Sequence, residues 1–229
     1  MSPPAPSTTP AHRAHAPFPR LHVLTDVRGA RDPLPEVRAA LAAGAGAIQV
    51  RAKEWSDRDV LALTRTVLDL ATPYAAHILV DDRVDVALLA GAHGVHLGVS
   101  DLPVAQVRRH VPRHFVIGAT VRDPAAARAA EAAGASYLGC GPAYPTTTKP
   151  GLPDPLGPPG IRAVTAATRL PVIAIGGVTP ERVPTLLASG AHGVATVTSL
   201  SEADDPWAAA AAFVAALDSD AADTRVVAP

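Results

Sequence analysis

The stretch HILVDDRVDVALLAGAHGVHL, residues 77–97, predicts one complete strand–helix–strand unit. It opens with the apolar run HILV (77–80), continues through an Ala- and Leu-rich segment at 83–90, and ends with GVHL (94–97). Short runs that are apolar throughout are typical of strands covered on both faces. The pair Gly91-Ala92 falls where the helix should end, because glycine readily adopts the left-handed conformation of a helix C-terminal cap.

The same alternation extends along most of the 229 residues. Eight short apolar runs predict strands: LHVLT (21–25), AIQV (47–50), HILV (77–80), GVHL (94–97), FVIGA (115–119), SYLGC (136–140), PVIAI (171–175) and GVATV (193–197). Candidate helices lie between and after them, near 33–43, 57–71, 83–90, 103–110, 124–133, 160–168, 180–189 and 206–216. Gly-Ala pairs at 44–45, 91–92, 134–135 and 190–191 precede every second strand, which indicates a weak repeat of two βα units.

This pattern predicts an α/β fold, and eight alternations favour a closed (β/α)8 TIM barrel. An open, doubly wound sheet is the alternative. We expect a single barrel domain over 17–217. Residues 1–16 are rich in Pro, Ala, Ser and Thr without a continuous apolar run, so we expect a disordered tail rather than a secretory signal. A loose tail is expected at 218–229.

Composition excludes several classes of protein. Hydrophobic residues make up 48% of the chain and aromatic residues 3%, so Ala, Val, Leu and Ile must fill the core. The formal net charge is -1, without the clustered positive charge of a nucleic-acid-binding surface. No apolar run is long enough for a membrane span. Cys140 is the only cysteine, which excludes an intramolecular disulfide and a cysteine zinc cluster. A cytoplasmic enzyme is expected, with a homo-oligomer left open.

Polar residues cluster where a barrel carries its active site, at the C-terminal ends of strands. Alternation along QVRAK (49–53) puts Gln49, Arg51 and Lys53 on one side, where two cations and an amide could bind an anion. The alternative is ordinary surface charge. Asp82 and Asp101 follow the next two strands, and two carboxylates can hold Mg²⁺ together with substrate phosphates.

Three later segments could bind phosphate. The loop GPAYPTTTKPG (141–151) offers three hydroxyl groups and a lysine, and its continuation LPDPLGPPG (152–160) is either an ordered loop or a disordered lid. AIGGVTP (174–180) and VTS (197–199) end the last two strands, where barrels often bind a phosphate near a helix N-terminus. We expect His96 to be a hydrogen-bonded wall residue and Cys140 a packed small residue rather than a nucleophile.

The chain resembles thiamine-phosphate synthases and their thiazole tautomerase relatives from about Leu21 to Leu200. The motifs that carry the resemblance are QVRAK (49–53), VDDRVDVALLAGAHGVHLGVSDLP (80–103), IGATV (117–121), GPAYPTTTK (141–149) and AIGGVTP (174–180).

The resemblance implies the following site. The pyrimidine diphosphate is held by positions matching Gln49, Arg51, Lys53, Asp81, Thr120 and Lys149, of which Arg51, Lys53 and Lys149 act in catalysis. The Mg²⁺ ligands match Asp82 and Asp101. The thiazole phosphate site matches Thr146, Thr147, Thr148, Gly177, Val197 and Thr198.

The chain departs from the family pattern at four positions. Asp81 replaces the usual Asn, and this adds a negative charge beside a diphosphate. Val99 replaces Gln, Thr120 replaces Ser, and Arg122 replaces the histidine that many relatives carry and that the tautomerase uses in proton transfer.

The resemblance implies a transferase of thiamine biosynthesis that joins hydroxymethylpyrimidine diphosphate to hydroxyethylthiazole phosphate, giving thiamine phosphate and diphosphate. We expect an Mg²⁺-assisted dissociative substitution, in which diphosphate leaves before the thiazole nitrogen attacks. Two other readings stay open: a thiazole tautomerase, and a non-catalytic barrel that binds a phosphate ligand. The paired aspartates, Lys53 and Arg122 favour the synthase over the tautomerase.

Overall fold

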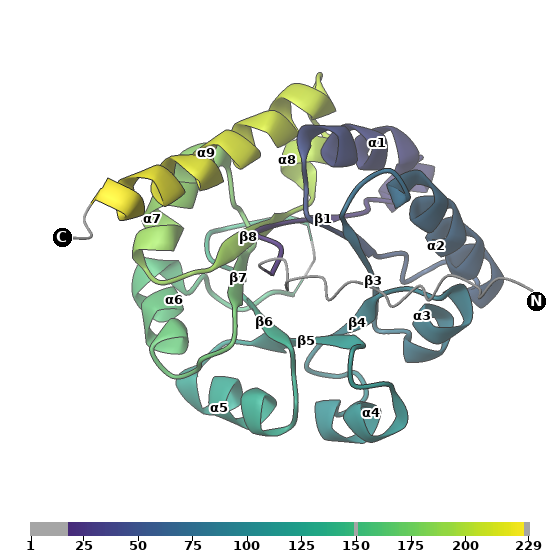
Figure 1. The fold of residues 1–229 in the computed structure, drawn as a ribbon, viewed down its shortest axis with the longest axis horizontal. Coiled ribbons are helices and arrows are strands. Elements are labelled where there is room, and N and C mark those ends of the chain that lie inside the picture. The colour runs from purple at the N-terminus through teal and green to yellow at the C-terminus, as the bar shows by residue number, and fades with distance from the viewer. Residues whose placement is uncertain (1–17, 149–150, 227–229) are drawn as a thin grey trace, which may run out of the picture.

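The computed structural model describes residues 18–148 and 151–226 and forms a closed barrel of eight parallel strands surrounded by helices (Figure 1). Consecutive strands pair all the way round, and β8 returns to β1 with Leu21 opposite Val194. This closure confirms the TIM barrel and excludes the open sheet. The strands are β1 Leu21–Leu24, β2 Ala47–Val50, β3 His77–Asp81, β4 Gly94–Leu97, β5 Val116–Val121, β6 Tyr137–Cys140, β7 Val172–Ile175 and β8 Gly193–Thr196.

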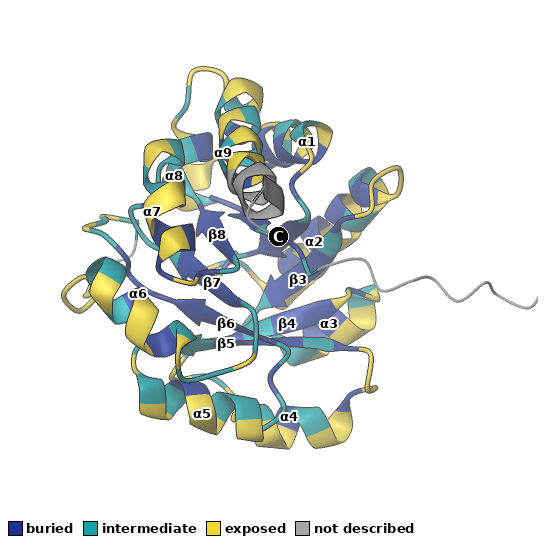
Figure 2. Ribbon diagram, turned by 60° about the vertical axis from the view of Figure 1, so that its left-hand side comes forward, coloured by how far each residue is buried: buried dark blue, intermediate teal, exposed yellow. Residues whose placement is uncertain are grey.

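Helices cover the outside of the barrel, and their outward faces are exposed while their inward faces are buried (Figure 2). They are η1 Arg28–Ala30, α1 Leu34–Ala43, α2 Asp57–Ala71, α3 Val84–Ala90, α4 Val104–His110, α5 Pro124–Ala132, α6 Gly157–Thr165, η2 Pro180–Arg182, α7 Val183–Ala188, α8 Thr198–Ser201 and α9 Pro206–Val226. Gly44 caps α1 with a φ of 99°, in the left-handed region that the Gly-Ala repeat predicts.

Two helices differ from the prediction. α6 begins at Gly157 rather than near 160, because Pro158 and Pro159 occupy its first turn, where a missing N–H costs nothing. α9 runs to Val226, ten residues past the predicted end of the helix at 216 and into the segment 218–229 expected as a loose tail, of which 227–229 lie outside the described residues. The sequence from 207 to 226 contains no glycine or proline that would stop it. The expected tail at 1–16 lies outside the described residues.

Alternation along the strands separates two cores. Side chains such as Ile48 and Val80 point outward and pack beneath the helices in the larger cluster. A smaller cluster inside the barrel joins Leu24, Leu79, Tyr137, Ile173 and Ala195. Burying one such aliphatic side chain contributes roughly 1.5–3 kcal/mol. The two cores leave one end of the barrel for the site.

The lower end of the barrel is closed by the ring of Phe18. Its centroid lies 5.1 Å from that of Tyr137, 5.7 Å from that of His22 and 6.1 Å from that of His192. Arg20 beside it donates to the carbonyl of His192 at 3.1 Å, which ties this end to the β7–β8 side. Phe18 therefore packs into the barrel at the N-terminal ends of the strands, opposite the C-terminal ends.

Candidate functional site

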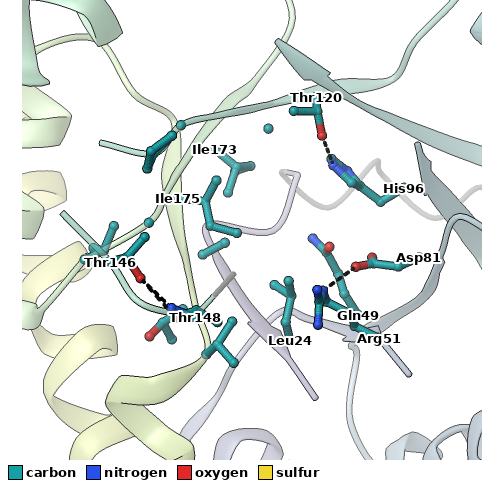
Figure 3. Close-up of a pocket in the computed structure, with 18 of the residues that line it drawn as sticks. Leu24, Gln49, Arg51, Asp81, His96, Thr120, Thr146, Thr148, Ile173 and Ile175 are labelled. Atoms are coloured by element: carbon teal, nitrogen blue, oxygen red, sulfur yellow. Dashed lines mark hydrogen bonds and ion pairs between the residues drawn. The ribbon is translucent and has the colours of Figure 1, made fainter. Parts of the chain in front are cut away.

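A pocket of about 200 Å³ opens at the C-terminal ends of the strands. Polar side chains from the β2, β3, β4 and β5 ends line one side, and Thr146 and Thr148 lie on the other (Figure 3). Leu24, Ile173 and Ile175 form the apolar surface between them. The pocket thus offers an ionic half and a hydroxyl-bearing half, separated by an apolar wall that suits the faces of flat rings.

The β2 end points its polar side chains into the pocket, as the alternation of QVRAK predicts. Gln49 is 3% exposed, and Arg51 and Lys53 follow it toward the rim. The backbone of Arg51 is clamped by Thr25, whose hydroxyl accepts from the Arg51 N–H at 2.8 Å and donates to its carbonyl at 3.1 Å. This clamp fixes the direction in which the guanidinium leaves the strand.

Asp82 and Asp101 lie together at the rim, as predicted for neighbouring strand ends. Their carboxyl groups are in hydrogen-bonding contact, and Lys53 Nζ lies 2.6 Å from Asp82 Oδ2. Asp82 adopts a φ of 66°, unusual for a residue other than glycine. Asp101 Oδ2 also accepts the backbone N–H of Gly98 at 2.6 Å.

The pKa values of the acidic groups are shifted by burial first and by contacts with one another second. Burial, and then the contact with Asp101, raises the pKa of Asp82. Burial works to raise the pKa of Asp101, but hydrogen bonds from Asp82 and Gly98 outweigh it and lower that pKa. Burial and the nearby Asp82 raise the pKa of Asp81 to about 7. Arg51 Nε is 3.9 Å from Asp81 Oδ2, while Asp81 Oδ1 is buried without a hydrogen-bond partner.

The crowded carboxylates fit a divalent cation. Among the described residues, no group of three or more His, Cys, Asp or Glu side chains could hold a metal by itself. Asp82 and Asp101 supply two adjacent oxygen donors, the number that Mg²⁺ commonly takes from protein when phosphate supplies other ligands. A cation between them would offset the cost of burying two adjacent carboxylates. The donor set therefore suits Mg²⁺ bound together with a phosphorylated ligand.

A chain of polar side chains continues from the pocket down into the barrel. Thr120 Oγ1 lies 2.9 Å from His96 Nε2 (Figure 3), and His96 Nδ1 lies 2.8 Å from the hydroxyl of Tyr137. Gln49 Nε2 reaches the same hydroxyl at 3.2 Å and His22 Nδ1 at 3.0 Å. Burial lowers the pKa of His22 to about 3 and that of His96 to about 4. The prediction of His96 as a hydrogen-bonded wall residue is confirmed.

The opposite half of the pocket comes from the ends of β6, β7 and β8. Thr146, Thr148, Gly177, Val197 and Thr198 all line it. Thr146 Oγ1 and Thr148 Oγ1 are 3.0 Å apart and hydrogen-bonded to each other, so the two hydroxyls lie side by side at the pocket. Thr147 between them is exposed and is not among the lining residues. Lys149 lies outside the described residues.

Gly177 is required by close packing as well as by its place in the pocket. Its φ is 62°, and a Cβ there would lie 2.4 Å from the carbonyl oxygen of Pro145. The loop after β6 is therefore seated directly on the β7 end. Arg182 lies over the ring of Tyr144 at 4.4 Å and holds the same loop from outside.

Arg122 serves as a tether for this loop. Its guanidinium donates to the carbonyl of Gly141 at 2.8 Å and to that of Asp154 at 2.8 Å. The two carbonyls flank the segment that carries the three threonines. The described continuation 151–160 is ordered against the barrel, since the Leu156 N–H donates to the Pro142 carbonyl at 2.9 Å.

Cys140 behaves as predicted, because it is fully buried and burial raises the pKa of its thiol to about 12. Sequence reasoning overlooked Tyr137 and His22, two polar residues in the barrel interior. The available signal was alternation: Tyr137 shares a face with Gly139, and His22 shares a face with Leu24.

Sequence reasoning also overlooked a clasp beside the site. Buried Asp26, after β1, accepts from Ser201 at 2.7 Å and from the guanidinium of Arg28 at 2.7 Å. Hydrogen bonding to Arg28 holds the pKa of Asp26 well below its usual range. This clasp ties the start of the chain to α8, whose first residue is Thr198.

Comparisons with known proteins agree on one family. A family model described as thiamine monophosphate synthase matches residues 21–200. A thiamine-phosphate synthase from Salinispora arenicola is 51% identical over 201 residues, covering 86% of this chain and 97% of that protein. One from Salinispora tropica is 49% identical with the same coverage. The solved thiamine phosphate pyrophosphorylase from Pyrococcus furiosus has a TM-score of 0.80 at 34% identity, covering 87% of this chain and 96% of that one.

Proposed function

The chain belongs to the thiamine monophosphate synthase family, and on that premise we propose how its pocket divides the work of joining two substrates. The enzyme is a transferase of thiamine biosynthesis. Hydroxymethylpyrimidine diphosphate occupies the ionic half and hydroxyethylthiazole phosphate the half lined by threonines. The observation that carries this assignment is the apolar wall between two polar halves, which lets two flat rings meet with their phosphorylated groups apart.

The diphosphate binds at the β2 and β3 ends. Arg51 and Lys53 point at the same space, and Asp81 beside them carries a buried oxygen without a partner. The resemblance to the family assigns Lys149 to this set as well, although it lies outside the described residues. The cationic groups stabilise the negative charge that grows on the leaving diphosphate, and this is electrostatic catalysis by groups already in position.

Asp82 and Asp101 are the residues that would hold Mg²⁺ bound together with the diphosphate. When bound, the ion supplies Lewis-acid stabilisation of the leaving group. Lys53 then shares its charge between Asp82 and the diphosphate, because its amine already lies at this rim.

The reaction is dissociative. The bond from the pyrimidine methylene carbon to the diphosphate oxygen breaks first, and the aminopyrimidine ring delocalises the cation that remains. The thiazole nitrogen then forms the new C–N bond. The protein orients both rings against Leu24, Ile173 and Ile175 and excludes water from the cation, so a general base is not required.

The thiazole phosphate binds at the β6, β7 and β8 ends. The hydroxyls of Thr146 and Thr148 are hydrogen-bonded to each other, which leaves one hydroxyl hydrogen of the pair to donate to the phosphate, and Thr198 faces the same half of the pocket. Thr147 is exposed, so it binds the phosphate through its backbone N–H or through a hydroxyl that turns toward the ligand on binding.

The tautomerase reading is disfavoured by Arg122. The tautomerase needs a proton-transferring histidine at this position. Arg122 tethers the loop here instead, and its two terminal guanidinium nitrogens donate to backbone carbonyl groups. The paired carboxylates also have no task in an isomerisation without diphosphate.

The decisive experiment is an assay of the purified protein with both substrates, with and without Mg²⁺. Metal-dependent formation of thiamine phosphate supports the proposal, whereas isomerisation of the thiazole alone supports a tautomerase, and binding without turnover a sensor. Lys149→Ala should slow diphosphate departure more than it weakens thiazole phosphate binding. The reverse result would place Lys149 at the thiazole phosphate.

A further inference from the structure

The hydrogen bonds inside the barrel form one continuous chain whose direction can be read from its lower end. His22 Nε2 lies 3.2 Å from the carbonyl oxygen of Pro19, which can only accept, so Nε2 carries the hydrogen. His22 Nδ1 faces the amide nitrogen of Gln49, which can only donate. His22 is therefore a neutral imidazole that accepts from Gln49.

The amide of Gln49 is fully used on its nitrogen side. One hydrogen of Nε2 goes to His22 and the other to the hydroxyl oxygen of Tyr137. What Gln49 can offer to a ligand in the pocket is consequently its oxygen, an acceptor. Its orientation depends on His22, which does not line the pocket, and on Tyr137, which does.

The hydroxyl of Tyr137 links Gln49 to His96 and sets which of the two partners it accepts from and which it donates to. Its oxygen already accepts from Gln49, and the tyrosine is fully buried, so its hydrogen needs an acceptor. His96 Nδ1 at 2.8 Å is that acceptor, which leaves the ring hydrogen of His96 on Nε2, facing Thr120 at 2.9 Å. The opposite tautomer would leave the Tyr137 hydrogen without an acceptor in the core, which is unfavourable.

Glycines on neighbouring strands leave the space that the rings of Tyr137 and His96 fill. A Cβ at Gly118 would lie 2.3 Å from Tyr137 Cζ and 2.4 Å from His96 Nδ1. A Cβ at Gly139 would lie 2.8 Å from His96 Cε1. Two glycines at inward-facing strand positions thus accommodate the tyrosine and the histidine.

We propose that this chain fixes the hydrogen-bonding polarity of the pocket, so that Thr120 keeps its hydroxyl hydrogen free to donate to a ligand and Gln49 offers a ligand only its amide oxygen, an acceptor. Tyr137 and His22 are then positioning residues that act through Thr120 and Gln49. The proposal rests on the function above only in naming the ligand groups: an oxygen of the diphosphate at Thr120 and an amino group of the pyrimidine at Gln49.

The first test needs no substrate. In ¹⁵N-histidine-labelled protein at neutral pH, long-range ¹H–¹⁵N spectra should show His96 with its hydrogen on Nε2, its signals being assigned by their loss in His96→Asn. Tyr137→Phe should abolish that fixed preference, whereas Tyr74→Phe should not, since it removes a hydroxyl from a half-exposed side chain. An Nδ1–H tautomer in the unmodified protein would overturn the proposal, even if Tyr137→Phe fails to fold.

The second test measures coupling, with inorganic diphosphate and Mg²⁺ as the probe. Tyr137→Phe should weaken diphosphate binding about tenfold, the equivalent of one lost hydrogen bond. In a Thr120→Val background the same change should add nothing, because the donor through which Tyr137 acts is already gone. Equal weakening in both backgrounds would reduce Tyr137 to a packing residue and overturn the inference.

The two readouts separate this inference from the proposed function. A fixed His96 tautomer in a protein that turns over neither substrate supports the chain and counts against the synthase. Turnover of both substrates by a protein whose His96 carries its hydrogen on Nδ1 supports the synthase and overturns the chain.

Discussion

Lys53 forms an ion pair with Asp82 at the mouth of the pocket, with 2.6 Å between Nζ and Oδ2. In the absence of ligands, the ammonium group of Lys53 therefore binds a carboxylate that the proposed Mg²⁺ site needs. The side chains are 41% and 20% exposed, and an ion pair this open rearranges at little cost. We therefore expect ligand binding to replace the contact between Lys53 and Asp82 by contacts of Asp82 with Mg²⁺ and of Lys53 with the diphosphate.

Asp82→Asn tests that exchange. It removes one oxygen charge from the cation site and frees Lys53, and kcat should fall about a hundredfold or more. The urea midpoint should change little, since Asp82 sits at the rim. Asp69→Asn, on the exposed face of α2, is the matched control. Near-normal turnover at saturating Mg²⁺ would contradict the assigned metal site.

Asp81→Asn should improve binding of the pyrimidine diphosphate. Asp81 Oδ1 is buried without a partner and Oδ2 faces Arg51 at 3.9 Å, so the carboxylate competes with the substrate for the guanidinium. The amide removes the charge, and KM for this substrate should fall roughly three- to tenfold, as expected for one partly screened charge. KM for the thiazole phosphate should stay constant. Asp81→Ala separates loss of charge from gain of a donor, and a raised KM in both variants would show that the carboxylate assists binding.

Arg122→Ala should loosen the loop that carries Thr146 and Thr148. Two hydrogen bonds to backbone carbonyls are lost, so KM for the thiazole phosphate should rise about tenfold while that for the pyrimidine diphosphate changes less. Limited proteolysis should cut near the loop faster. Arg128→Ala, on an exposed position of α5, controls for loss of a positive charge. Equal effects on both KM values would argue against a loop-specific role.

Mild acid should destabilise the barrel through its buried histidines. Burial lowers the pKa of His22 from 6.5 to about 3, and burial also lowers the pKa of His77 and of His93. A group whose pKa is lower in the folded state stabilises the fold fully above its unfolded pKa. That contribution is lost as the pH falls from 6.5 toward 3.

Between about pH 7 and about pH 5.5, His22 alone should cost about 1 kcal/mol of unfolding free energy. Urea titrations at the two pH values measure the difference, and His22→Gln, which cannot titrate, should reduce it. His110→Gln, on an exposed residue of α4, should not. Identical pH dependence in His22→Gln would show that His22 is solvated in the folded state.

The sequence predicts the barrel well because strand identity is a local property. Each of the eight apolar runs contains a strand, and AIQV and GVHL match their strands over the full length. The ends of helices are harder to predict. α6 begins earlier than predicted because two prolines form its first turn, and α9 extends further because no glycine or proline stops it. The four residues of α8 are too few to form a helix without the contact between Asp26 and Ser201, so no local pattern marks it.

The site was predicted as a set of strand ends but not as a set of contacts. Alternation brings Gln49 and Arg51 to one face, and the adjacency of two strand ends places Asp82 beside Asp101. The pairing of Lys53 with Asp82 depends on a flexible side chain, which alternation does not specify. The roles of Tyr137 and His22 depend on partners 41 and 27 residues away, His96 and Gln49, and no motif joins them.

Within the described residues, no helix is both long and apolar enough to span a bilayer. The remaining expectation about oligomeric state is open to a direct measurement of mass in solution.

Lys53 and Lys149 are the only lysines in the sequence, against eighteen arginines among the 20 basic residues. The Lys53 side chain is 41% exposed at the pocket mouth, so an amine-acylating reagent has very few primary amines to modify and meets one of them there. The extent of acylation at Lys53, followed by mass spectrometry, thus becomes a titratable signal of pocket occupancy that needs neither a chromophore nor turnover.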